Sequence, residues 1–274
     1  MHSRFSSLSI ATLLAVTSAA VAAPVALDPT MAGAWASGSG ARAEFRAIDP
    51  DWHDSSVWWN ETTRTYSAVQ ASGYERIGTL AWGTGIWGLN DWARVLSNDV
   101  ASVASWSGTV ARIEQANQRY RDDWGNSWGD VARMPDAIPA ENWTAQYTGY
   151  LRISDAGLYN FGVLYDDGFF LRIHGADGQF VEISSDFVRT ARDRLGFDED
   201  LLLSEGLYRF ELGAYNRLEA GVVQLAWQRG DRGWESVPTE HLVTDPTRIP
   251  LPGTLAMVAL GGIGFVAFRK RSGR

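Results

Sequence analysis

The sequence of 274 residues contains no cysteine and only 4 histidines, and its acidic residues outnumber the basic ones, 32 to 24. Without cysteine there is no disulfide framework, no thiol nucleophile and no cysteine-ligated zinc site. The net charge of -8 argues against nucleic-acid binding, which needs a basic face to meet phosphates. The same charge suits a highly soluble protein that attracts divalent cations.

Two motifs of common enzyme classes are missing as well. The sequence has no His-Glu-x-x-His and no P-loop. Glycoside hydrolysis needs two carboxylates about 5 to 9.5 Å apart, and nothing singles out such a pair here. His53, His174 and His241 are scattered along the chain. We therefore predict that the protein is not an enzyme and keep a glycoside-acting enzyme as the less favoured alternative.

Aromatic residues are abundant: the chain has 13 tryptophans and is 45% hydrophobic, which predicts a large aromatic core. Many tryptophans between Trp52 and Trp128 stand beside turn-forming residues, and we expect long loops with short strands there. Such tryptophans either stack on sugar rings or pack in the core, and core packing is the commoner role. Trp58 and Trp59 are the candidates for ligand binding, because neighbours on a strand cannot both face the core.

Alternation of apolar and polar residues with a period of two predicts half-buried antiparallel strands. The pattern is found in 147–153, 159–165, 169–173, 208–214 and 223–227. Asp166-Asp167-Gly168 has the composition of a turn, and we expect it to join two of these strands as a hairpin. Its adjacent carboxylates repel each other unless a positive charge lies between them. A turn or a cis bond is needed to bring both together.

Both ends of the chain are predicted to be targeting segments. Residues 1–23 have a weakly basic start, a short apolar middle and small residues at Ala20–Ala23, as in a secretory signal peptide. Residues 24–40, rich in Ala, Gly and Ser, predict a flexible lead-in. Residues 254–268 form an apolar run of about the minimum length for a transmembrane helix, and the basic tail 269–274 should stay cytoplasmic.

The C-terminal segment resembles the PEP-CTERM sorting signal. Pro250-Leu251-Pro252, in the linker 246–253, stands where that signal has Pro-Glu-Pro, and Arg269-Lys270-Arg271 forms its basic cluster. The resemblance implies recognition by an exosortase, a sorting protease. It also implies an inner-membrane tether through the helix, followed by release to the cell surface or extracellular matrix. Leu251 departs from this pattern, and the departure bears on cleavage by the exosortase rather than on membrane anchoring.

Residues 143–245 contain, in order, Gly149-Tyr150-Leu151, Gly157-Leu158-Tyr159-Asn160-Phe161, Asp166-Asp167-Gly168, Leu171-Arg172-Ile173-His174-Gly175 and Gly206-Leu207-Tyr208-Arg209-Phe210. This series of motifs resembles that of a PA14 domain. The resemblance implies an all-β fold, an antiparallel β-sandwich or barrel, for a domain spanning 41–245. In sugar-binding relatives the Asp pair holds calcium, which implies Asp166 and Asp167 as metal ligands here. Asn216, on the predicted loop 216–221, is the candidate for a further ligand, since calcium takes six to eight oxygens. The Asp-Asp-Gly motif also makes a good turn without any ion.

These observations favour an exported, non-enzymatic carbohydrate-binding module that uses calcium to engage extracellular polysaccharide. The alternative is a structural scaffold of the cell surface or matrix that has no defined sugar site. Calcium binding and glycan binding distinguish the two.

Overall fold

The computed structural model describes residues 23–33, 38–52, 57–60, 65–68, 85–86, 88–123, 131–186 and 193–246. The predicted signal peptide, the Pro-Leu-Pro motif and the segment 254–274 lie outside these ranges, apart from residue 23. Among the described residues there is no helix of the length and apolarity that crossing a membrane requires.

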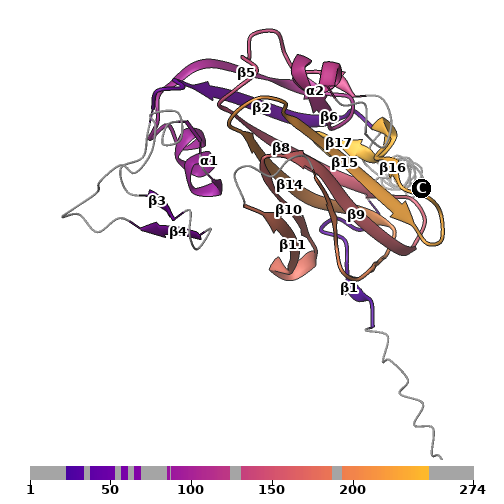
Figure 1. Cartoon of the computed structure of the whole chain (residues 1–274). Coiled ribbons are helices and arrows are strands. Elements are labelled where there is room, and N and C mark those ends of the chain that lie inside the picture. The colour runs from indigo at the N-terminus through magenta and orange to yellow at the C-terminus, as the bar shows by residue number, and fades with distance from the viewer. Residues whose placement is uncertain are drawn as a thin grey trace, which may run out of the picture.

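Two β-sheets lie face to face in the described part of the chain (Figure 1). The first follows the order β1-β13-β9-β15-β6-β7, and β12 and β16 pair with β9 and β15. Its strands are β1 (Val25–Leu27), β6 (Glu114–Ala116), β7 (Ala132–Arg133), β9 (Gly157–Asp166), β12 (Asp193–Gly196), β13 (Leu201–Leu203), β15 (Val222–Arg229) and β16 (Glu235–Ser236).

The second sheet follows the order β11-β10-β14-β8-β2-β5, and β17 pairs with β8. Its strands are β2 (Ala41–Ile48), β5 (Ser102–Val110), β8 (Trp143–Ile153), β10 (Gly168–His174), β11 (Phe180–Ser185), β14 (Gly206–Asn216) and β17 (Leu242–Val243). A separate pair joins β3 (Val57–Asn60) to β4 (Thr65–Ala68).

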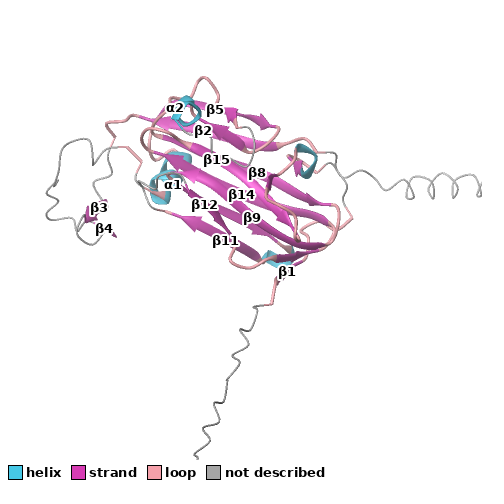
Figure 2. Cartoon of the chain, turned by 45° about the vertical axis from the view of Figure 1, so that its right-hand side comes forward, coloured by secondary structure: helices cyan, strands magenta, loops and turns pink. Residues whose placement is uncertain are grey.

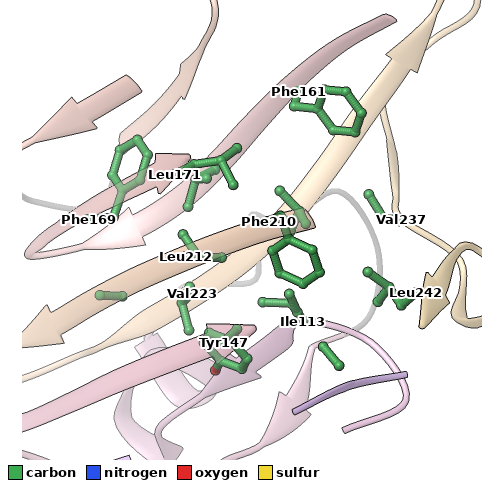
Figure 3. Packing of buried hydrophobic residues seen from close by; sticks show 14 of the residues in the cluster. Ile113, Tyr147, Phe161, Phe169, Leu171, Phe210, Leu212, Val223, Val237 and Leu242 are labelled. Atoms are coloured by element: carbon green, nitrogen blue, oxygen red, sulfur yellow. The ribbon is translucent and has the colours of Figure 1, made fainter. Parts of the chain in front are cut away.

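The main core lies between the two sheets and is built from the alternate residues that the sequence pattern predicts. Tyr147, Phe161 and Phe210 are almost completely buried there, and they come from β8, β9 and β14 (Figure 3). Since β9 belongs to the first sheet and the other two strands to the second, their side chains hold the layers together. The prediction of a largely antiparallel sandwich is confirmed, with parallel pairing at β1–β13 and β6–β7.

Helices are short and lie at the margins of the sheets (Figure 2). They are α1 (Leu89–Leu96), α2 (Gln118–Asp123), and the 3-10 turns η2 (Ala176–Gly178) and η3 (Thr239–His241). The expectation of loops and short strands between Trp52 and Trp128 missed α1 and the nine-residue β5.

Helix α1 packs on the outer face of the second sheet, away from the main core. The indole N–H of Trp92 donates to the Ala145 carbonyl at 2.8 Å, and the Trp92 ring meets Phe170 edge-on at 4.8 Å. A Cβ at Gly213 would lie 2.2 Å from the Phe170 ring and 2.7 Å from that of Trp92. Glycine at 213 therefore lets both rings approach β14.

The N-terminal segment departs from the predicted flexible lead-in, because residues 25–31 are hydrogen-bonded into the fold. β1 pairs with β13 of the first sheet. Pro29 and Met31 form bridges with Gly175 and Leu207, next to the second sheet. This segment therefore closes one end of the sandwich.

Candidate functional site

Asp166-Asp167-Gly168 connects the two sheets, so the predicted hairpin is wrong. Asp166 is the last residue of β9 and pairs with Val222 of β15 in the first sheet. Gly168 opens β10 and pairs with Tyr215 of β14 in the second sheet. A Cβ at Gly168 would lie 2.5 Å from the Tyr215 ring, which explains the glycine. Turn-forming residues serve a hairpin and a crossing between sheets equally well, so composition alone did not separate them.

Both carboxylates of this connection are buried at the end of the sandwich. Asp166 and Asp167 are each 6% exposed, and the peptide bond between them is cis. The Asp167 backbone N–H donates to the Tyr215 carbonyl at 2.8 Å, and Asp167 Oδ2 accepts the backbone N–H of Arg217 at 2.8 Å. Two buried carboxylates side by side are costly unless cations or hydrogen-bond donors compensate them.

Asn216 lies beside this pair, as predicted, but it is the last residue of β14 rather than part of a loop. Its side chain is completely buried. The amide Nδ2 donates to the Ala140 carbonyl at 3.1 Å, and this contact fixes which way round the amide lies, since a flip would set two oxygens against each other. Asn216 Oδ1 has no hydrogen-bond partner among the residues that the structure describes. A buried amide oxygen without a partner is uncommon and requires an explanation.

The Ala140 carbonyl anchors the surroundings of Asn216. Besides Asn216 Nδ2, it faces Asn117 Nδ2 at 2.8 Å and the indole N–H of Trp143 at 3.2 Å. Asn117 Nδ2 also lies 2.7 Å from the Glu219 carbonyl. These contacts tie the loop before β8 to the connection between β14 and β15. The sequence carries no signal for the contacts of Asn117 and Asn216, because their partners are far apart in the chain.

Tyr215 links the Asp pair to helix α1. Its carbonyl accepts the Asp167 N–H, and its hydroxyl donates to Asp186 Oδ1 at 3.0 Å. The same Asp186 oxygen accepts the backbone N–H of Leu89 at 2.8 Å, at the start of α1. Burial raises the pKa of Asp186, and the hydrogen bonds from Leu89 and Tyr215 oppose that rise. Asp186 thus caps a helix that has no local side-chain cap.

The oxygen atoms at this end of the sandwich are of the chemical types that bind calcium. Calcium is bound by carboxylate, amide and carbonyl oxygens, which the Asp pair and Asn216 Oδ1 provide. No cluster of three acidic, histidine or cysteine side chains occurs in the described ranges, so further ligands would have to be amides, carbonyls or water. A surface pocket of about 390 Å³, lined by Glu44, Arg46 and Asn98 among others, is a separate feature beside β2 and β5.

Trp58 and Trp59 are adjacent residues of β3, opposite Ser67 and Tyr66 of β4. Their side chains lie outside the described part of the structure, so their role in ligand binding stays a prediction. The sorting residues Pro250, Leu251, Pro252, Arg269, Lys270 and Arg271 lie outside it as well.

A protein-family model for the PEP-CTERM protein-sorting motif matches residues 248–271. The C-terminus carries a PEP-CTERM sorting motif. The sequence prediction is confirmed despite Leu251 in the middle of Pro-Leu-Pro. Among curated proteins, none matches the sequence.

Solved structures similar to this chain include PA14 domains. A PA14 sugar-binding domain from an RTX adhesin has a TM-score of 0.45 at 13% identity and covers 75% of this chain and 98% of its own. The epithelial adhesin 9 A domain from Candida glabrata, in complex with Galb1-3GlcNAc, has a TM-score of 0.49 at 13% identity and covers 84% and 99%. An anti-sigma factor domain-containing protein has a TM-score of 0.44 at 15% identity and covers 79% of this chain; the match spans about half its own length, 51%.

Proposed function

We propose that the protein is an exported, non-enzymatic carbohydrate-binding module, and that a calcium ion held by Asp166, Asp167 and Asn216 supports its sugar site. The observation that carries this proposal is the buried Asn216 Oδ1, an acceptor without a partner among the described residues, on a residue whose two chain neighbours contact the buried Asp167. A cation among these oxygens would satisfy the amide oxygen and neutralise the Asp pair at once.

Each residue has a separate task in this proposal. The two Asp carboxylates supply the negative charge that holds the ion, and Asn216 adds a neutral oxygen at an orientation fixed by Ala140. The Arg217 N–H holds Asp167 Oδ2 in place. A bound calcium ion would coordinate the oxygens of a pair of sugar hydroxyls. We further propose that Trp58 and Trp59 pack on sugar rings, because an aromatic face suits the C–H face of a pyranose.

The PEP-CTERM motif supports export and sorting to the cell surface. We propose that residues 1–23 direct export, that 254–268 tether the protein to the inner membrane, and that an exosortase then releases it to the surface or matrix. The polysaccharide expected there is the candidate partner. No nucleic acid is expected as a partner, since the charge is negative.

Calorimetric calcium titration of the solubilised full chain tests the site, with Asp166→Ala/Asp167→Ala as the variant. Asp198→Ala/Glu199→Ala is the matched control, because it removes two adjacent but exposed carboxylates. We expect one calcium per chain for the wild type and the control, and none for the site variant. Calcium uptake that is equal in all three proteins would contradict the proposal.

A glycan array read with calcium and with a chelator tests the sugar. We expect glycan binding that requires calcium and is lost in Asp166→Ala/Asp167→Ala. Calcium binding without any glycan binding would leave the surface or matrix scaffold as the function. Release of sugar from a bound glycan would instead show an enzyme.

A further inference from the structure

β5 is a long edge strand, and in the described part of the chain one of its sides has no partner strand. Only β2 pairs with it among the described strands, and it ends the order of the second sheet. Its nine residues, Ser-Val-Ala-Ser-Trp-Ser-Gly-Thr-Val, include no charge and no proline. Proteins usually protect edge strands with charges, prolines or very short length, because a free edge pairs with other chains.

The other sheet ends are protected in these ways. β1 and β7, at the ends of the first sheet, have three and two residues. β11, at the opposite end of the second sheet, has Glu182 at its centre, where it is ion-paired with Arg172 of β10. Two β11 strands side by side would bring two Glu182 carboxylates close together. β5 therefore differs from β1, β7 and β11, the terminal strands at the other three ends, because neither short length nor charge protects its free edge.

The side chains of β5 suit pairing with a second copy of the same strand. Ser105, Ser107 and Thr109 are exposed on the outer face, while Trp106 packs toward the core, 5.9 Å from Phe45. Antiparallel pairing about a two-fold axis keeps the core faces of both copies on one side. It sets hydroxyl side chains opposite hydroxyl side chains, a favourable cross-strand combination.

Charges at the two ends of β5 favour the antiparallel direction. Exposed Asp99 precedes the strand, and exposed Arg112 follows it. In an antiparallel pair the start of one strand lies beside the end of the other, so each Asp99 lies at the same end of the contact as Arg112 of the second copy, whose guanidinium also lies 4.0 Å from Glu114. This arrangement occurs twice in a symmetric dimer. A parallel pair would instead bring like charges together.

We propose that two copies of this chain associate through antiparallel pairing of β5, which joins their seven-stranded sheets into one continuous sheet. The sugar site proposed above lies at the ends of β9 and β14, so a dimer would present two such sites. The association does not depend on calcium or sugar, because neither contacts β5 in the proposal.

Cysteine cross-linking tests this contact, since the natural sequence contains no cysteine. Ser107→Cys in the full chain places one thiol on the outer face of β5, and Ser184→Cys places one on exposed β11 as the matched control. With Ser107 of one copy opposite Ser107 of the other, the register that also sets Ser105 opposite Thr109, the two Ser107 Cα atoms lie within disulfide range. We expect Ser107→Cys to form the cross-linked dimer at least roughly tenfold faster than Ser184→Cys, because pairing raises the local thiol concentration. Equal rates would overturn the proposal.

Sedimentation of the solubilised full chain gives an independent measurement. Wild type and Ser184→Lys should sediment as dimers, and Ser105→Lys/Ser107→Lys as a monomer, because four lysines would face each other in the paired strands. All three positions are exposed, so the folds should be intact, and circular dichroism checks this. A monomeric wild type, or a dimer that persists in Ser105→Lys/Ser107→Lys, would overturn the proposal.

Discussion

The two ends of the sandwich differ in how their buried polar groups are satisfied. At one end of β14, the Tyr208 hydroxyl accepts the Ser204 N–H at 2.9 Å and lies 2.9 Å from the Leu27 carbonyl and 3.1 Å from that of Ser204. At the other end, where Asp166 and Asp167 are buried, Asn216 Oδ1 has no partner within the described ranges. The hydrogen bonds of the Tyr208 hydroxyl are satisfied by protein groups alone, whereas Asn216 Oδ1 lacks such a partner in the described part of the chain. The comparison therefore separates an end closed by protein hydrogen bonds from the end at which we propose a binding site.

The largest expected effect is a calcium-dependent gain in stability at the Asn216 end. At a calcium concentration of about 100 Kd the gain is about 2.7 kcal/mol, or roughly 5–10 °C in Tm for a domain of this size. Thermal melts with calcium and with chelator should show this shift in the wild type and in Tyr208→Phe. Asn216→Ala should lose most of it. A full shift in Asn216→Ala would remove the distinction between the two ends.

The next effect concerns the Tyr208 end. Tyr208→Phe leaves the Ser204 N–H and the Leu27 carbonyl without their partner, and we expect a loss of about 1–3 kcal/mol in unfolding free energy. Urea unfolding measures it, and the loss should be the same with calcium and with chelator. A loss that changes with calcium would show that the two ends are coupled.

Alkaline pH should weaken the Tyr208 end selectively. Burial raises the pKa of Tyr208 to about 12, whereas an unfolded tyrosine titrates near about 10. The folded state therefore keeps the phenol proton longer, and this contribution to stability is lost as the pH rises above about 10. The difference in unfolding free energy between wild type and Tyr208→Phe should shrink over that window. A constant difference would show that Tyr208 titrates alike in both states.

The smallest effect is expected at Asp186, which connects the Asn216 end to α1. Because burial raises its pKa, the folded state binds this proton more tightly than the unfolded state, whose Asp titrates near about 3.9. The stability of the wild type relative to Asp186→Asn should therefore rise as the pH falls from neutral toward that value. Urea unfolding of both proteins across this range measures it. A relative stability that falls with decreasing pH would contradict the assignment.

Period-two alternation was sufficient to predict the central strands β8, β9, β10, β14 and β15, because each has one face on the core. It did not predict α1, whose eight residues bury only Asp91, Trp92 and Val95 and give too short a helical pattern. It also missed β12, whose residues are partly or fully exposed and lack alternation. These elements depend on tertiary contacts rather than on local pattern.

The candidate site was predictable only in part, for a related reason. The Asp pair is a local motif, and Asn216 was predicted as a further calcium ligand on the later loop. The Ala140 carbonyl that orients Asn216, and the Asp186 carboxylate that links Tyr215 to α1, come from distant parts of the chain. Neither position has a residue type that indicates its role.

The final strand determines how the domain would respond to force. β17 contributes two residues, paired with Tyr150 and Leu151 of β8, and its Leu242 carbonyl accepts the N–H groups of Ser39 and Gly40 at 2.9 and 3.0 Å. Tension applied through the chain beyond residue 246 would reach these few hydrogen bonds before any long strand. The domain would then peel from its C-terminal edge at low load, while the longer pairing of β8 with β14 stays intact.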